Sequence, residues 1–447
     1  MKRGTLAVFS LSVLVPSSSQ TLLIPAIPVL ADERGFSVVT NGWLLSAFLI
    51  AASISAPLLG RIGDLKGRRN LAVLTSAAYV TGSLICLVGG DHGLVVSVGR
   101  AFQGLSAGVF ALHIAAIQQV VSGAATRAAH IGVLSGVVAM GPAVGFLVGG
   151  TVTAHFGVSM LFALGIGIGV LSTVLLWFWA PASGGTSEGS VDVWGAVLVA
   201  SSLLCLLTFL AELGVSGPTS SRSLLALGCT TVALAVTVVW LRRVSTPFID
   251  LSILVERVSA LGNLATALSA GAMFGLFVAV PQLVQGEAGT GFGLGPVSAG
   301  LFLVPGAIAM VLVGPLAGRV GASRGYGGVI VAGNAVCAVG MIALALLPPT
   351  MALVVVLATL AGLGIGVAFP AMPSVVMLSA PRDSVGVAAG INSLSRGIGS
   401  AVGAQLVLML AVAEPATAGT GQRSAFVMSA VCAVMAAAVA GGIVRRR

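Results

Sequence analysis

The sequence has very few charged residues. Only 7% of its 447 residues are Asp, Glu, Lys or Arg, whereas an average soluble domain carries about a quarter. In contrast, 57% of the residues are hydrophobic. A chain of this composition would expose large apolar surfaces in water and aggregate. The composition therefore excludes a water-soluble globular protein.

Motifs for metals, cofactors and catalysis are also missing. The five cysteines lie singly inside apolar runs, at Cys86, Cys205, Cys229, Cys337 and Cys432. We interpret them as small packing residues and not as a metal site or a disulfide frame. The sequence has no GxxxxGK[ST] phosphate-binding loop, which argues against ATP as the energy source. It has no metal-spaced His/Cys/Asp cluster either. We expect no cofactor, no metal and no enzymatic activity.

Apolar runs of roughly 20 residues fill most of the chain, and this is the length that a helix needs to cross about 30 Å of hydrocarbon. Backbone groups in lipid must be satisfied within their own segment, so these runs indicate helices and not barrel strands. We predict an all-α polytopic membrane protein with 14 transmembrane helices. The predicted spans are 5–30, 41–60, 70–90, 93–120, 130–152, 157–180, 193–213, 222–241, 258–285, 297–317, 327–347, 351–376, 385–412 and 424–443. The first run has no A-x-A-like cleavage site, which favours a retained helix over a signal peptide.

The basic residues test this topology. The net charge is +9, but Lys and Arg lie in loops and at the chain ends, so we exclude a nucleic-acid partner. With the N-terminus inside, 16 of the 21 Lys and Arg residues fall on the cytoplasmic side. Only Arg34, Arg222 and Arg423 fall outside, and Arg100 and Arg396 lie within helices. This asymmetry predicts a multi-pass plasma-membrane protein with both termini in the cytoplasm.

A repeat divides the chain. The segment "GPLAGRVGASRGYG" at Gly314–Gly327 matches "APLLGRIGDLKGRR" at Ala56–Arg69, 258 residues earlier. Both are predicted to lie in loops, after the second and the tenth helix. Parallel halves of this kind suit a transporter whose two bundles rock about a central site. We predict six-helix bundles at 1–180 and 257–447, with two inserted helices and their linkers at 181–256.

Several motifs occur in a recognisable order. They are "WLLSAF" at Trp43–Phe48, "GRIGDLKGRR" at Gly60–Arg69, "GRAFQG" at Gly99–Gly104, "GVVAMGPAVGFLVGG" at Gly136–Gly150 and "TPFIDLSIL" at Thr246–Leu254. Together they resemble the major facilitator superfamily, and within it the 14-helix drug:proton antiporter branch. The resemblance implies the major facilitator fold, and its Gly-Pro motif in the fifth helix is typical of exporters. The branch usually has an acidic residue where this chain has Ser19, and the second loop copy has Ala322 where the first has Asp64.

The resemblance also implies roles for charged residues. Arg100, with Gln103 one turn further along, is a candidate for proton coupling; the alternative is a structural arginine bonded to neighbouring carbonyls. A charge in mid-membrane is costly, which favours a functional role. Candidate proton acceptors are Asp32, Glu33 and Glu212. The loop motif predicts a cytoplasmic gate formed by Gly60, Asp64, Gly67, Arg68 and Arg69, where a swap of ion pairs could be bistable.

Other polar and flexible positions complete the candidate site. Gly141, Pro142 and Gly145 are predicted to form a hinge or a close-packing site, because Pro removes a backbone hydrogen bond and Gly admits a neighbour. The candidate substrate-binding residues are Gln20, His113, Gln282, Gln285, Asn392 and Arg396. A single histidine such as His113 is more often a satisfied interior residue than a ligand. Arg396 could instead extend to the cytoplasmic surface.

These features predict a secondary active transporter. We expect proton-coupled export of small amphipathic compounds, such as an antibiotic or a toxic metabolite, by a monomer in the lipid bilayer. Few acids lie in the membrane, which disfavours a strongly cationic substrate. One alternative is a proton-coupled importer or facilitator of a nutrient, and the other is a non-transporting membrane receptor with the same fold.

Overall fold

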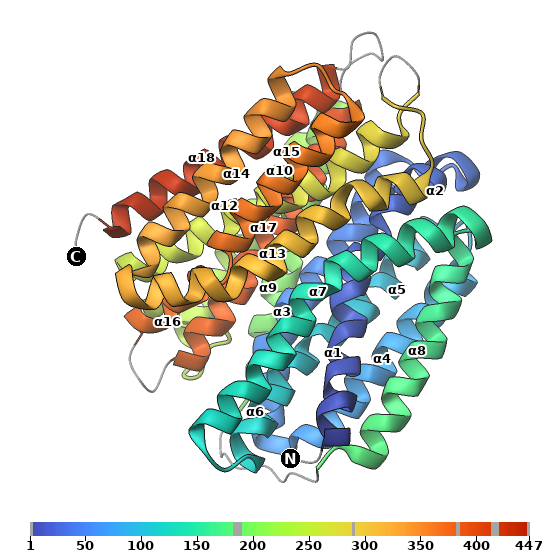
Figure 1. Cartoon of the computed structure of the whole chain (residues 1–447). Coiled ribbons are helices and arrows are strands. Elements are labelled where there is room, and N and C mark those ends of the chain that lie inside the picture. The colour runs from blue at the N-terminus through green and yellow to red at the C-terminus, as the bar shows by residue number, and fades with distance from the viewer. Residues whose placement is uncertain (1–2, 182–189, 288–290, 381–384, 413–419, 445–447) are drawn as a thin grey trace.

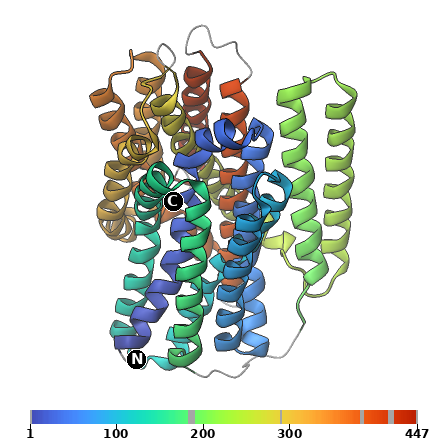
Figure 2. The same ribbon diagram turned by 90° about the vertical axis from the view of Figure 1, so that its right-hand side faces the viewer.

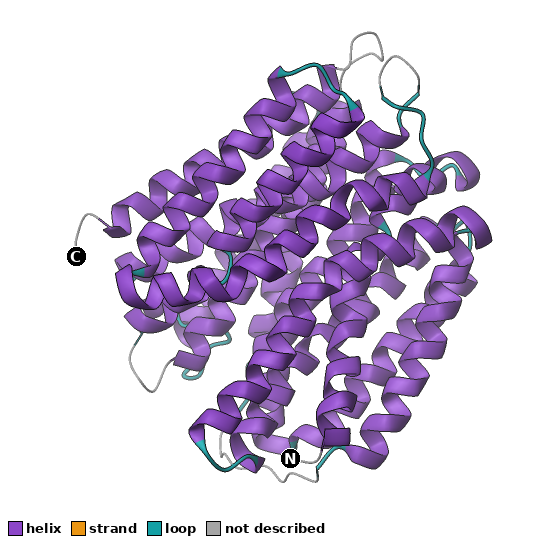
Figure 3. Ribbon diagram, in the orientation of Figure 1, coloured by secondary structure: helices purple, strands orange, loops and turns teal. Residues whose placement is uncertain are grey.

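The computed structural model describes residues 3–181, 190–287, 291–380, 385–412 and 420–444, and within these ranges it contains helices and no strand (Figure 3). Fourteen helices in this part of the chain are long and apolar enough to cross a membrane. The predicted number of spans and the all-α class are therefore confirmed. High apolar content leaves only intrahelical hydrogen bonds for the backbone, which is why every long segment is helical.

Three spans are interrupted by a turn or a break. The first six spans consist of α1 (Arg3–Leu22), η1 (Ile24–Ala26), α2 (Ile27–Arg34), α3 (Val38–Lys66), α4 (Arg68–Gly89), α5 (Gly93–Leu105), η2 (Ser106–Gly108), α6 (Val109–Val120), α7 (Ala124–Phe156) and α8 (Val158–Trp179). The middle of the chain forms α9 (Val193–Ser216), α10 (Ser221–Arg243) and α11 (Leu251–Val255). The last six spans consist of α12 (Arg257–Gln285), α13 (Pro296–Arg324), α14 (Tyr326–Leu346), α15 (Met351–Ala368), α16 (Ala371–Ser379), α17 (Val385–Val412) and α18 (Thr420–Val444).

The repeated motif is mostly helical, so its prediction as a loop was wrong. α3 continues to Lys66, α4 begins at Arg68, and only Gly67 turns the chain, with φ 95° and ψ 139°. Gly325, 258 residues later, turns it with φ 93° and ψ 135°. Glycine adopts this region of φ without a steric penalty. The long basic side chains at the helix end can reach water from the helix, so the helix does not have to stop where the apolar run stops.

The two groups of six helices meet along two seams. Along the first seam, α3 packs on α17 over most of its length: Gly42 contacts Gln405, Ser53 contacts Gly397 and Pro57 contacts Gly390. We call the membrane side at which α3 ends the basic side. Since Pro57 lies near that end of α3, this seam stays in contact toward the basic side.

The second seam, between α7 and α13, is closed only on the opposite side. There Gly150 packs on Pro296 and Gly300 packs on Phe146. Nearer the basic side, the space beside Gly136 of α7 and Gly318 of α13 is open. Figure 1 shows the same arrangement, in which the two groups of helices approach each other at the top and diverge toward the N-terminus.

α9 and α10 form a hairpin at the edge of the molecule, shown in green at the right of Figure 2. α9 packs against both α3 and α17, while α10 packs mainly on α9. Asp192 fixes the base of the hairpin: its carboxylate caps α9 at the Gly195 N–H (2.7 Å) and accepts hydrogen bonds from the Trp240 indole (3.0 Å) and the Phe248 N–H (2.9 Å). The hairpin therefore covers the seam between α3 and α17, on the flank away from α7 and α13.

Candidate functional site

Arg100 lies at the centre of the N-terminal group of helices, with only 1% of its surface exposed. Its guanidinium donates three hydrogen bonds: to the Leu44 carbonyl oxygen (3.1 Å), to the Ser19 carbonyl oxygen (3.0 Å) and to Gln103 Oε1 (2.7 Å). It also lies 4.6 Å from the ring centre of Phe48, a favourable cation–π distance. Arg100 thus ties α5 to α1 and α3 through neutral acceptors.

A second layer of polar contacts supports Arg100. Gln103 donates from Nε2 to Ser83 Oγ of α4 at 2.8 Å. The Ser19 hydroxyl lies 2.5 Å from the Tyr79 hydroxyl, which is also on α4. The four helices that surround Arg100 are therefore joined by one network of buried polar groups. Buried polar networks of this kind fix a unique arrangement when every member is satisfied.

The predicted proton acceptors lie away from Arg100. Asp32 and Glu33 are exposed in the last turn of α2, on the side opposite the basic side. Glu212 is partly exposed on α9, where it accepts a hydrogen bond from Ser216 at 3.0 Å. Among the acidic side chains that the structure describes, none is buried. Where the branch usually has a carboxylate, Arg100 donates to the backbone carbonyl oxygen of Ser19.

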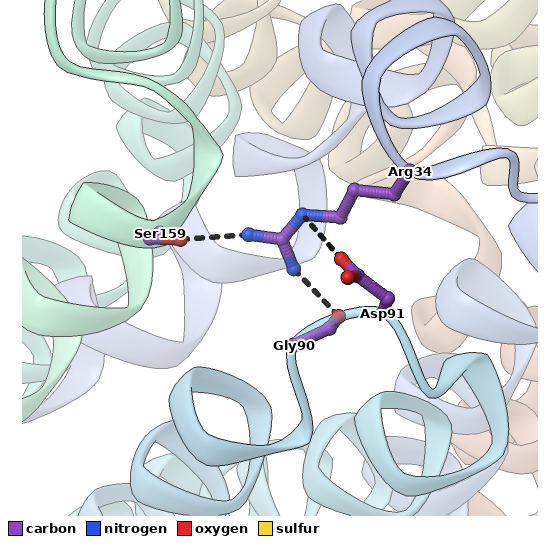
Figure 4. Close-up of polar contacts among 4 residues, drawn as sticks. All are labelled: Arg34, Gly90, Asp91 and Ser159. Atoms are coloured by element: carbon purple, nitrogen blue, oxygen red, sulfur yellow. Dashed lines mark hydrogen bonds and ion pairs between the residues drawn. The ribbon is translucent and has the colours of Figure 1, made fainter.

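Arg34, next to these acids, closes the same end of the N-terminal group (Figure 4). Its guanidinium donates to the Gly90 carbonyl oxygen and to Ser159 Oγ, both at 2.7 Å, and lies 3.9 Å from an oxygen of Asp91. It therefore joins α2 to the turn after α4 and to the start of α8. All four residues belong to the same half, so this cluster does not connect the halves.

The predicted gate residues lie where α3 meets α4. Arg68 donates to Gln119 Oε1 of α6 at 2.7 Å. Arg69 donates to the Trp177 carbonyl oxygen of α8 and lies 5.9 Å from the centre of the Trp177 ring. Both arginines thus connect helices of the N-terminal group to one another at the basic side.

Two of the remaining gate residues are glycines, which act through their backbone. The side chain of the third, Asp64, lies outside the part of the molecule that the structure describes. Gly67 provides the positive-φ corner, and the space beside Gly60 is open. Asp64 falls in the last turn of α3. Its part in the gate, which rested on an ion-pair swap, stays a prediction.

The predicted hinge residues pack closely on α1. Gly141 contacts Ser17 and Gly145 contacts Thr21, whose hydroxyl donates to the Pro142 carbonyl oxygen at 3.3 Å. α7 continues without a break from Ala124 to Phe156. Of the two predicted roles, the geometry supports close packing, since small residues allow the two backbones to approach.

Two of the predicted substrate-binding residues lie inside the halves and not between them. His113 is buried in the N-terminal group, where its ring stacks on Phe9 at 3.8 Å and its Nε2 lies 2.6 Å from Ser12 Oγ. Asn392 is buried in the C-terminal group and donates to Thr266 Oγ1 at 2.8 Å. The structure therefore does not bring these two side chains together with the other candidates.

The other four are at least partly exposed, and one of them connects the halves. Gln285 of α12 donates to the Pro25 carbonyl oxygen of η1 at 3.0 Å and so connects the two halves on the side opposite the basic side. Gln20 of α1 and Gln282 of α12 are partly exposed. Arg396 of α17 is exposed in the middle of its helix.

Sequence reasoning missed three residues that complete these clusters. Tyr79 and Ser83 anchor the polar network on α4. Phe369, at the break between α15 and α16, lies 5.6 Å from the Arg396 guanidinium. The Phe-Pro pair at 369–370 was a usable signal, because proline removes a backbone hydrogen bond and interrupts a helix.

The sequence and the fold are both similar to those of known transport and resistance proteins. The chain is 25% identical over 410 residues to the tetracenomycin C resistance and export protein of Streptomyces glaucescens, covering 91% of this chain and 75% of that one. It is 26% identical over 376 residues to the multidrug resistance protein Stp of Mycobacterium tuberculosis, covering 83% and 69%. Its fold matches that of a POT family peptide transporter with a TM-score of 0.68, 17% identity and coverage of 100% and 97%.

A family profile completes the assignment. Residues 9–404 match the profile of the Major Facilitator Superfamily. This match spans most of the chain and includes both copies of the repeated motif. The chain therefore belongs to the Major Facilitator Superfamily, and it is a membrane transport protein and not an enzyme.

Proposed function

We propose that this protein exports small amphipathic compounds, such as antibiotics or toxic metabolites, by alternating access. The observation that carries the proposal is the difference between the two seams: the halves touch throughout on the side opposite the basic side, but separate between α7 and α13 toward the basic side. Units 1–180 and 257–447 would rock against each other, and the hairpin within 181–256 would follow them. Movement of two bundles about a central site is how transporters with duplicated halves work.

The basic side is assigned to the cytoplasm. Lys and Arg near the ends of membrane helices collect in the cytoplasm, and the corner between α3 and α4 and the ends of α10 and α13 carry such residues. Both termini would then be cytoplasmic and the protein would lie in the plasma membrane. In this orientation the described conformation is open to the cytoplasm, which is the state in which an exporter takes up its substrate.

The named functions of the relatives support the substrate class. Two relatives that align with most of the chain are named for antibiotic export or multidrug resistance. The 14 candidate spans and the named functions of these relatives favour the 14-helix drug antiporter branch over a nutrient importer. Exchange for protons is the coupling that this branch implies, with Arg100 and Gln103 as coupling residues and Asp32, Glu33 or Glu212 as proton acceptors. The transporting unit would be the monomer, because one chain contains both halves and the space between them.

Drug susceptibility tests export. An efflux-deficient host that expresses the protein should tolerate several-fold higher concentrations of at least one amphipathic antibiotic than a host with an empty vector. If tolerance is unchanged for every compound while the protein is present in the membrane, the export proposal is wrong. Dissipating the proton gradient should stop export of a fluorescent substrate within minutes. Export that continues at the same rate would rule out proton exchange.

A further inference from the structure

Arg396 differs from every other described arginine in the molecule, because it lies in mid-helix and is exposed. α17 runs from Val385 to Val412, so Arg396 is more than two turns from either end. Among the described residues, its guanidinium makes one hydrogen bond, from Nη2 to Ser393 Oγ at 3.3 Å. Since a guanidinium has five N–H donors, most of the donors of Arg396 have no acceptor among the described residues.

The neighbours of Arg396 on α17 show which way it points. Gly397 packs on Ser53 of α3, across the seam between the halves. Gly399 and Gly403 pack on α12, within the C-terminal half. Successive residues of a helix are about 100° apart, so Arg396 lies on the face between the contacts with α3 and those with α12. This face is turned toward the space between the two halves.

That space is open toward the basic side. On α13, Gly318 lies five turns from Gly300 and on the same face, which packs on α7, and the space beside Gly318 is open. The space beside Gly132 and Gly136 of α7 is also open. A molecule that enters between α7 and α13 would approach the face of α17 that carries Arg396, whose guanidinium lies 5.6 Å from the centre of the Phe369 ring.

Among the residues that the structure describes, Arg396 forms no ion pair with a side chain, whereas Arg34 lies near Asp91 at the far end of the other half. An arginine in mid-membrane without an anion is costly to maintain. Its planar fork of donors matches a carboxylate or sulfonate in a bidentate geometry. The missing partner is therefore best supplied by the substrate.

We infer that Arg396 and Phe369 form a binding site for amphipathic organic anions: the guanidinium binds the acidic group and the ring contacts the apolar body. This inference rests on the proposed export function and names its substrate class. A neutral compound with the same apolar body would gain the contact with Phe369 but not the charge-assisted hydrogen bonds, which are about twice as strong as neutral ones.

A matched pair of fluorescent probes tests the site: 1-pyrenebutyrate and its uncharged methyl ester. Binding of each to the purified protein in detergent, and export of each from proteoliposomes, are measured for the wild type, Arg396→Ala, Arg396→Lys and Arg319→Ala. Arg319 is an exposed arginine near the end of α13, so its variant controls for the loss of one positive charge. Arg396→Lys keeps the charge but loses the bidentate geometry.

We expect Arg396→Ala to weaken binding of the carboxylate about tenfold, which corresponds to about 1.4 kcal/mol, and to change binding of the ester less than about twofold. Arg396→Lys should bind the carboxylate less tightly than the wild type and more tightly than Arg396→Ala. Arg319→Ala should bind both probes as the wild type does. Equal loss of both probes, or wild-type binding of the carboxylate by Arg396→Ala, overturns the inference, and so does a wild type that binds neither probe. A wild type that binds the carboxylate in an Arg396-dependent way but does not export it supports the site and contradicts the export function.

Discussion

The chain places one arginine inside each half of the membrane domain, and the two have opposite surroundings. Arg100 is buried and donates three hydrogen bonds to protein acceptors. Arg396 is exposed and donates one, to Ser393. Both lie near a phenylalanine ring. The difference indicates that the first arginine holds its half together, whereas the second is available to a molecule that enters between the halves.

The largest effect is expected from the same substitution at the two sites. Arg100→Lys keeps a buried charge but cannot reach three acceptors at once, so it should lower the free energy of unfolding by about 3 kcal/mol or more. Arg396→Lys should change it by less than about 0.5 kcal/mol. Thermal unfolding in detergent, followed by tryptophan fluorescence, measures both. Equal losses of stability at the two sites would remove the distinction between them.

A smaller loss is expected when one acceptor of Arg100 is removed. Gln103→Leu leaves a donor of Arg100 without its acceptor and removes the hydrogen bond that Ser83 Oγ accepts, and an unsatisfied buried group costs about 1–3 kcal/mol. The variant should unfold at a lower temperature than the wild type. Gln118→Leu, on the exposed surface of α6, is the control and should leave the midpoint unchanged. A stable Gln103→Leu protein would mean that water or another side chain replaces the amide.

The outer layer of the network should contribute least. Tyr79→Phe removes one hydroxyl and its hydrogen bond to Ser19, so a loss of about 1 kcal/mol is expected. The only other tyrosine, Tyr326, lies in the C-terminal half and is partly exposed. Tyr326→Phe therefore provides a matched control that should unfold with the wild type. If the two variants lose the same stability, the hydroxyl of Tyr79 has no special role in holding Arg100.

Hydropathy was sufficient to predict the number of spans and the all-α class, and the motifs were sufficient to indicate the fold family. The number of spans, the class and the repeat at an offset of 258 residues agree with the structure. The ends of α3 and α4 were missed, because charged residues mark the end of the apolar run but not the end of the helix. The break at Phe369 was missed for the opposite reason: the segment stays apolar across the interruption.

The site was less predictable, because a polar residue in a membrane helix can face its own bundle or the space between bundles. His113 and Asn392 face inward, whereas Arg396 faces the space between the halves. The sequence specifies each of these residues but not the rotation of its helix about its axis. That rotation depends on where small residues allow a close contact, as at Gly397 and Gly399 of α17.

The hairpin of α9 and α10 affects the directions from which a compound dissolved in the bilayer can approach the central space. α9 lies against α3 and α17 at the same time, so it screens that flank of the central space from lipid. The opposite flank, between α7 and α13, has no such cover among the described helices. The molecule is thus asymmetric about its long axis, and an apolar compound dissolved in the leaflet on the basic side has one lateral approach to the central space, where the two six-helix halves alone would offer two.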